Sequence, residues 1–281
     1  MRRRTFIAAL LSAGVGASAA AAFARYRSPL VTDGEGIPRA AAVVTPTPTP
    51  TPPAPSPTPT PTPAPPVSTN PLAAPVPLPG GAISALPDGT GAMAWTVDDG
   101  LDGEVVRRYV EFAKATGTRL TFFVTGSYPA WAQNAALLTP LVASGQIQLG
   151  NHTWTHPDLT SLSDAGVVDE LQRNHDFLTS TFGVDPRPYF RPPYGFHDGR
   201  VDRLAASIGY TSPVLWYGSL SDSSLLTDQQ VIDFATQWFL PDHIVIGHLN
   251  FLPVTEVFPQ LTTILVERGL PTVTLHDVFE S

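Results

Sequence analysis

The sequence predicts an α/β fold, a distorted (β/α) barrel of about seven strands with helices outside it. Two observations support this prediction. From about residue 85 onward, short apolar runs alternate with amphipathic stretches, as happens where strands and helices alternate in a parallel sheet. Polar side chains capable of chemistry follow several of these runs, and in a parallel barrel the carboxyl ends of the strands meet at one face.

The expected strands are short runs rich in branched and aromatic side chains. They cover residues 92–97, 120–125, 147–149, 189–190, 213–217, 243–247 and 272–275. Helical patterns lie between them. Val105, Tyr109 and Phe112 share one helical face, and Ser163 is placed to cap a second amphipathic helix. Gly183 stands where that second helix should end.

The first 24 residues have the pattern of an export signal. Arg3 and Arg4 precede Thr5-Phe6-Ile7, a stretch rich in Ala, Leu and Gly follows, and a small-x-small pattern stands at residues 22–24. The arginine pair favours the twin-arginine route. An uncleaved segment would instead be a membrane tether, but the stretch is barely long enough to span a bilayer. We therefore expect an extracellular or cell-wall-associated protein.

Residues 25–85 are expected to form a disordered linker rich in Pro and Thr. Thr and Pro alternate almost without break at 45–66, which favours an extended polyproline II spacer over a packed core. At about 3.1 Å per residue this run would reach on the order of 70 Å. Such a spacer suits an enzyme that reaches through a cell wall.

The remaining residues, 86–281, are enough for one domain with a full core. They hold 10 basic and 22 acidic side chains, a formal charge of −12. An acidic domain without a basic cluster argues against a nucleic-acid partner and permits a neutral amide or ester substrate. The chain has no cysteine, so any metal must be held by His, Asp or Glu.

Two segments carry the pattern of a catalytic metal site. His152 and His156 follow one expected strand, and Asp98 and Asp99 stand side by side at the end of another. Two imidazoles and one carboxylate make a three-ligand site with an open position, which is typical of catalytic rather than structural metal ions. The second carboxylate is then free to act as a base. The pattern therefore indicates a metal-dependent hydrolase.

With these residues in place, the domain resembles the polysaccharide deacetylases of the NodB-homology group, carbohydrate esterase family four. The resemblance covers about residues 90–280, and its motifs occur in the family's order. The strongest are Thr96-Val97-Asp98-Asp99-Gly100, His152-Thr153-Trp154-Thr155-His156 and Arg191-Pro192-Pro193-Tyr194-Gly195.

Two later motifs depart from the family pattern. Trp216 leads to Asp222 at the family's spacing, but Ser223 stands where a second Trp is usual. Ile246-Gly247-His248 matches the last motif, with Leu249 where Asp is common. These departures bear on the wall of the acetyl pocket and on the choice of substrate, while the reaction type stands.

The resemblance implies a role for each remaining site residue. Asp99, His152 and His156 would hold one divalent metal ion; Zn²⁺ is favoured, and Co²⁺, Ni²⁺ or Mn²⁺ suit the same ligands. Asp98 would be the general base that takes a proton from the attacking water, and Arg191 would pair with it.

On the other side of the reaction, the resemblance implies a general acid and an oxyanion donor. His248 would protonate the leaving amine, and Asp222 would hydrogen-bond His248 and keep it protonated. The backbone N–H of Tyr194 would donate to the tetrahedral oxyanion.

The sequence thus predicts an exported metal-dependent hydrolase that removes N-acetyl groups from N-acetylglucosamine-containing polysaccharide, either peptidoglycan or a chitin-like polymer. Two alternatives stay open. The same site could serve an O-acetyl xylan esterase or a hydrolase of small amides. The domain could also be a non-catalytic cell-wall-binding module with a vestigial metal site. No obligate protein partner is evident.

Overall fold

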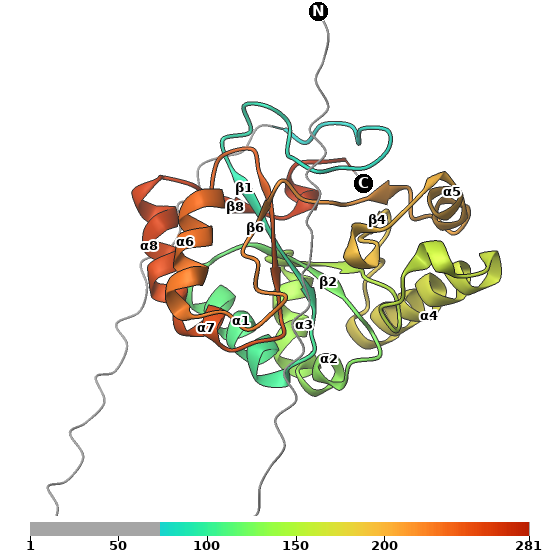
Figure 1. The fold of residues 1–281 in the computed structure, drawn as a ribbon, viewed down its shortest axis with the longest axis horizontal. Helices are drawn as coiled ribbons and strands as arrows, with labels where there is room; N and C mark the ends of the chain where they lie inside the picture. The colour runs from blue at the N-terminus through green and yellow to red at the C-terminus, as the bar shows by residue number, and fades with distance from the viewer. Residues whose placement is uncertain (1–73, 281) are drawn as a thin grey trace, which may run out of the picture. The chain divides into compact units, whose positions relative to one another are not determined.

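The computed structural model describes residues 74–280 (Figure 1). The predicted export segment at residues 1–24 and the Thr/Pro run at 45–66 lie outside the described residues. Among residues 74–280, no helix combines the length and the apolar character that crossing a membrane requires.

The described chain is built around one parallel sheet that curls into a half-barrel. Seven strands follow the order β5-β4-β3-β2-β1-β7-β6, and β8 pairs with β1 off this path. The strands are β1 Met93–Asp99, β2 Leu120–Val124, β3 Ile147–Asn151, β4 Tyr189–Phe190, β5 Ser212–Pro213, β6 Gly218–Ser219, β7 Ile244–His248 and β8 Thr272–Val273. The predicted α/β fold with a barrel-like sheet of about seven strands is confirmed.

Helices flank the sheet, and Figure 1 shows α6 and α8 together at one side and α4 and α5 at the other. The helices are α1 Gly103–Thr116, α2 Pro129–Gln133, α3 Ala135–Ala143, α4 Asp164–Phe182, α5 Gly199–Ser207, α6 Asp228–Trp238, α7 Pro253–Glu256 and α8 Phe258–Glu267. Short 3₁₀ turns at Leu159–Ser161, Pro193–Gly195 and Leu275–Asp277 complete the regular structure.

Capping residues explain where the two longest helices begin and end. The Asp102 carboxylate accepts hydrogen bonds from the N–H groups of Glu104 and Val105 at the start of α1. Ser163 accepts from Gly166 N–H at the start of α4, as its position predicted, and Gly183 ends that helix with a φ of 71°. Because Asp102 is held as a helix cap, it is not available to the pocket that Asp98 and Asp99 enter.

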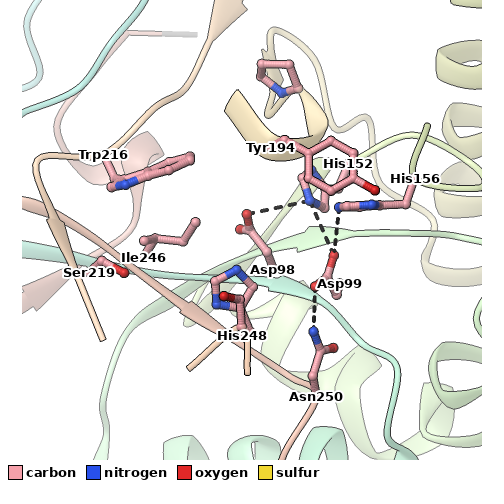
Figure 2. A pocket seen from close by; sticks show the side chains of 12 residues that line it. Asp98, Asp99, His152, His156, Tyr194, Trp216, Ser219, Ile246, His248 and Asn250 are labelled. Carbon is pink, nitrogen blue, oxygen red and sulfur yellow. Dashed lines mark hydrogen bonds and ion pairs between the residues drawn. The ribbon is translucent and has the colours of Figure 1, made fainter. Parts of the chain in front are cut away.

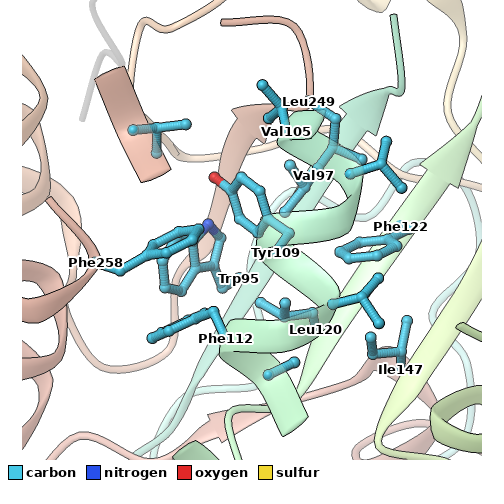
Figure 3. Close-up of a cluster of buried hydrophobic side chains, with 14 of the residues drawn as sticks. Trp95, Val97, Val105, Tyr109, Phe112, Leu120, Phe122, Ile147, Leu249 and Phe258 are labelled. Atoms are coloured by element: carbon cyan, nitrogen blue, oxygen red, sulfur yellow. The ribbon is translucent and has the colours of Figure 1, made fainter. Parts of the chain in front are cut away.

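Strand β1 is the central element, and all seven of its residues are buried. An aromatic cluster packs against it (Figure 3). The Trp95 ring lies 5.9 Å from that of Tyr109 on α1, and Phe112 stacks on Phe258 of α8 at 4.2 Å. Each buried aromatic ring contributes a large hydrophobic area, so this cluster packs β1 against both α1 and α8. The fixed strand holds the two carboxylates at its carboxyl end in a set position.

The predicted strand at 213–217 is wrong as one element. Only Pro213 lies in a strand, at the end of β5, and residues 214–217 cross from β5 to β6, which lies at the opposite edge of the sheet. The carbonyl oxygens of Val214 and Leu215 accept hydrogen bonds from the Arg191 side chain. The apolar run has the composition of a strand, but here it connects the two edge strands.

Part of the segment predicted as a linker, between residues 76 and 85, contacts the domain. Ile83 is buried, its N–H donates to Pro213 O at 2.8 Å, and Ile83 O accepts from Leu215 N–H at 2.7 Å. Val76 pairs with Phe279 by a backbone bridge. The Pro-rich composition hides these few apolar contacts in the sequence.

Candidate active site

An open pocket of about 410 Å³ lies where the central strands end (Figure 2). Most of the residues predicted for the site line it: Asp98, Asp99, His152, His156, Tyr194 and His248. The other two, Arg191 and Asp222, are buried behind it and reach it through hydrogen bonds to Asp98 and His248. Strand ends far apart in the sequence therefore converge on one cavity, as parallel topology requires.

Three side chains in this pocket form a group that could hold a metal ion: Asp99, His152 and His156. Asp99 Oδ1 lies 3.4 Å from His152 Nε2 and 3.2 Å from His156 Nε2. Tetrahedral ligands at about 2.1 Å from Zn²⁺ would be roughly 3.4 Å apart. Asp99 Oδ1 is also buried without a hydrogen-bond partner among the described residues. The donor set and its spacing therefore fit a divalent cation.

Outer contacts orient these ligand atoms. His152 Nδ1 lies 2.7 Å from the carbonyl oxygen of Arg191, so the N–H on Nδ1 donates to that oxygen and Nε2 faces Asp99. The Asn250 side-chain amide donates to Asp99 Oδ2 at 2.7 Å. With one carboxylate oxygen held by Asn250, only Asp99 Oδ1 is directed at the two imidazoles.

The electrostatics of the group favour an ionised Asp99. Burial alone would raise its pKa, but His152, His156 and the hydrogen bond from Asn250 hold that pKa well below the usual range. Burial and the neighbouring His152 lower the pKa of His156. Burial also disfavours a charged His152, yet the Asp98 and Asp99 carboxylates outweigh it and raise the His152 pKa. An anionic carboxylate and a neutral His156 are the states that bind a cation.

The backbone at these positions adopts conformations that side chains usually avoid. Asp99, Thr153 and His156 have φ angles of 75°, 70° and 63°. Residues in this left-handed region cost about 1–3 kcal/mol unless the surroundings hold them, and they cluster at functional sites. Trp131 holds one of them, because its indole N–H donates to Asp99 O at 2.8 Å.

Asp98 forms a fully buried ion pair with Arg191. Arg191 Nη1 lies 2.6 Å from Asp98 Oδ1, and the two side chains are 0% and 2% exposed. The guanidinium also donates to Thr96 Oγ1, and it lies 4.2 Å from the Phe123 ring centre. The other carboxylate oxygen, Asp98 Oδ2, lies 3.6 Å from His152 Nε2, and Asp98 lines the pocket. The base predicted from the sequence is thus oriented by an arginine that water does not reach.

His248 lines the pocket, and the buried Asp222 carboxylate is hydrogen-bonded to its imidazole. His248 Nδ1 lies 3.0 Å from Asp222 Oδ1, and its backbone N–H donates to Asp222 Oδ2 at 3.2 Å. Burial disfavours the charged imidazole, but the Asp222 carboxylate outweighs it and raises the His248 pKa. An imidazole held on one side by a carboxylate can present a proton on Nε2 to a group in the pocket.

Tyr194 enters the pocket from a rigid turn. Its φ of 59° is left-handed, Pro192 and Pro193 precede it, and Gly195 follows with a φ of 71°. The Tyr194 ring lies 4.8 Å from that of His156. The turn carries Tyr194 to the rim beside the group of metal-ligand candidates.

Sequence reasoning missed two residues that hold the site together. Asn250 fixes Asp99, and Glu170 on α4 accepts hydrogen bonds from the N–H and the hydroxyl of Thr155, both at 2.7 Å. Glu170 thereby ties down the loop between His152 and His156. A buried acid on the apolar face of a predicted helix is a signal that could have identified Glu170. Nothing local distinguishes Asn250 from an ordinary loop residue.

Comparison with known proteins agrees with this geometry. A polysaccharide deacetylase family model matches residues 86–213. Chitin deacetylase 1 from Cryptococcus neoformans var. grubii is 32% identical over 175 residues, which are 61% of this chain and 34% of that protein. The structure of T48 deacetylase with substrate is similar at 30% identity and a TM-score of 0.59, over 66% of this chain and 89% of that one.

The chain belongs to the polysaccharide deacetylase family. A CE4 family pseudoenzyme from Bacillus anthracis shares the fold, with a TM-score of 0.63 at 21% identity over 72% of this chain and 70% of that one. The family therefore includes members described as pseudoenzymes, so activity must be argued from the site residues themselves. The chain spans about a third of the length of chitin deacetylase 1.

Proposed function

We propose that this protein is an exported metal-dependent hydrolase that removes N-acetyl groups from N-acetylglucosamine units of a cell-wall or chitin-like polysaccharide. The observation that carries the proposal is the placement of two polar pairs around one pocket. Asp98, paired with Arg191, and His248, paired with Asp222, enter the same cavity as the Asp99, His152 and His156 group. An acid, a base and a metal-binding group are what amide hydrolysis needs.

In this proposal Asp99, His152 and His156 hold the cation, which when bound polarises the acetyl carbonyl and acidifies water. Asp98 takes a proton from the attacking water, and Arg191 balances the carboxylate charge and fixes its direction. The Tyr194 backbone N–H is the proposed donor to the oxygen that gains negative charge.

His248 completes the proposed reaction. An amine leaves only if its nitrogen is protonated, and His248 lines the same pocket as Asp98. The Asp222 carboxylate outweighs the effect of burial and raises the His248 pKa, which favours the protonated imidazole that the proposal needs. The proton taken up by Asp98 and the proton given by His248 leave the protein's total charge unchanged over one turnover.

Export and localisation are part of the proposal and rest on the sequence. The arginine pair, the apolar stretch and the Thr/Pro spacer precede the family domain in an order that suits an enzyme acting outside the cell. The neutral pocket lining beyond the catalytic group also suits a sugar amide: it includes Trp216, Ile246, Ser219 and Ser223.

The test is acetate release by the purified protein from N-acetylglucosamine oligomers, peptidoglycan and acetylated xylan. Each substrate is assayed after chelation and again after Zn²⁺ or Co²⁺ is returned. The proposal expects metal-restored release from at least one N-acetyl substrate. A folded, metal-loaded protein that releases no acetate from the N-acetylglucosamine oligomers or from peptidoglycan would overturn it.

An O-acetyl esterase is the second candidate, and a relative motivates it. The bifunctional xylanase/xylan deacetylase of Cellvibrio japonicus is 25% identical over 181 residues. An ester needs less help from an acid because its leaving group is better. A His248→Ala variant that keeps ester activity while losing amide activity would favour this reading.

The presence of Asp98 and Asp222 argues against a third reading, a non-catalytic wall-binding module, because a protein that only binds a metal needs neither side chain.

A further inference from the structure

A second hollow adjoins the active-site pocket and has a different character. It has a volume of about 320 Å³ and is lined by Tyr194, Gly195, Phe196, Leu215 and Trp216. Tyr194 and Trp216 also line the active-site pocket, so the two hollows share these residues as walls. Figure 2 shows both rings bordering the active-site pocket near Asp98. None of the five residues that line the second hollow carries a charge.

The aromatic rings at this hollow are exposed although exposure is unfavourable for them. Tyr194 is 58% exposed and Phe196 is 54% exposed. Their ring centres are 5.8 Å apart and the planes are inclined by 45°. Grouped exposed apolar side chains beside a pocket mark binding surfaces more often than single ones do. Phe196 belongs to none of the buried clusters, so packing of the core does not account for it.

The turn that carries these rings is held in place. Gly195 N–H donates to Pro192 O and Phe196 N–H donates to Pro193 O, both at 3.0 Å. A Cβ at Gly195 would lie 3.2 Å from Cη2 of Trp216, and the φ of 71° favours glycine, so glycine suits the close approach of the turn to that indole. Rings on a rigid turn lose little entropy when a ligand covers them.

We propose that Tyr194, Phe196 and Trp216 form an aromatic subsite that binds the sugar ring next to the one being deacetylated. The inference rests on the proposed function and deepens it by naming the side chains that bind the neighbouring sugar of the polymer. A β-linked N-acetylglucosamine ring presents a flat face of C–H groups, which packs on aromatic rings, and a neutral ring needs no charged partner. The hollow is of the size of small-molecule sites, and it shares Tyr194 and Trp216 with the cavity that Asp98 lines.

The test measures binding in an inactive background, so that it does not depend on turnover. Calorimetry follows an N-acetylglucosamine pentamer binding to the zinc-loaded full chain carrying Asp98→Asn, with and without Phe196→Ala. We expect roughly three- to tenfold weaker binding without the phenyl ring. The matched control is Tyr217→Ala, because Tyr217 is equally exposed at 61% but lines neither hollow. A Phe196→Trp variant should bind the pentamer as the parent does.

Kinetics with Asp98 intact give a second readout. Phe196→Ala should raise the KM for the pentamer by the same factor and leave kcat near the parent value, because Phe196 does not line the catalytic pocket. Equal affinity with and without Phe196, an equal loss in Tyr217→Ala, or no pentamer binding by any variant would overturn the subsite. A binding difference in a protein that releases no acetate would keep the subsite and refute the proposed function. Acetate release with an unchanged KM in Phe196→Ala would support the proposed function and refute the subsite.

Discussion

Replacing Arg191 with Met should destabilise the domain by removing the partner of a buried carboxylate. Arg191 and Asp98 are 0% and 2% exposed and 2.6 Å apart, so Asp98 would be left as an unpaired buried charge. Breaking such a pair from one side costs about 3–5 kcal/mol of the free energy of unfolding. For a domain of this size, each kcal/mol lowers Tm by about 2–4 °C, so the expected drop is roughly 6–20 °C.

The assay is unfolding of the full chain in urea and by heat, followed by circular dichroism. Arg203→Met is the control, because Arg203 is exposed and its guanidinium only donates to Gly199 O within its own helix. That variant should lie within about 0.5 kcal/mol of the wild type.

The double variant Asp98→Asn with Arg191→Met separates charge from packing. Because the unpaired charge is then absent, the double variant should be about 1–3 kcal/mol more stable than the sum of the two single effects predicts. Additive effects, or a loss below about 1 kcal/mol in Arg191→Met, would refute the reasoning that Arg191 acts by balancing the charge of Asp98.

Three further predictions concern the groups around the pocket. Asp222→Asn removes the carboxylate that raises the His248 pKa, so His248 should lose its proton at a lower pH than in the wild type. The alkaline limb of the kcat/KM profile should therefore move to lower pH, and an unmoved limb would exclude His248 as the acid. Asn250→Ala frees Asp99 Oδ2 and should weaken Zn²⁺ binding by about 10- to 100-fold in calorimetry, whereas unchanged affinity would remove Asn250 from the site. Gly100 has a φ of 93°, and a Cβ there would lie 2.3 Å from the Trp131 indole, so Gly100→Ala should lower the free energy of unfolding by about 2 kcal/mol or more. Tm should then fall by several degrees, and an unchanged Tm would contradict the tight packing of Gly100 on Trp131.

The part of the site that local patterns specify could be predicted from the sequence. Asp98 and Asp99 end a strand whose apolar run is interrupted only by Thr96, and His152 and His156 sit four positions apart just after another strand. In a parallel sheet, the order of strand ends is enough to place such residues at one face. The same reasoning located Arg191 after β4.

Features that depend on contacts between distant segments could not be predicted. Residues 214–217 cross from one edge of the sheet to the other because of the order in which the strands pair. An apolar run in the sequence does not indicate that order. Asn250 reaches Asp99 across 151 positions of sequence. Val76 and Ile83 anchor the segment before the domain, but single apolar residues among prolines do not stand out from a linker.

The most direct test of the account measures zinc binding and acetate release on the same preparations of wild type, Asp98→Asn and His156→Ala. The account predicts that Asp98→Asn binds one Zn²⁺ as tightly as the wild type does but releases acetate at least about a hundredfold more slowly. It predicts that His156→Ala loses tight zinc binding and acetate release together. A wild-type rate in Asp98→Asn, or wild-type zinc affinity in His156→Ala, would contradict the assignment of these two residues and with it the central claim.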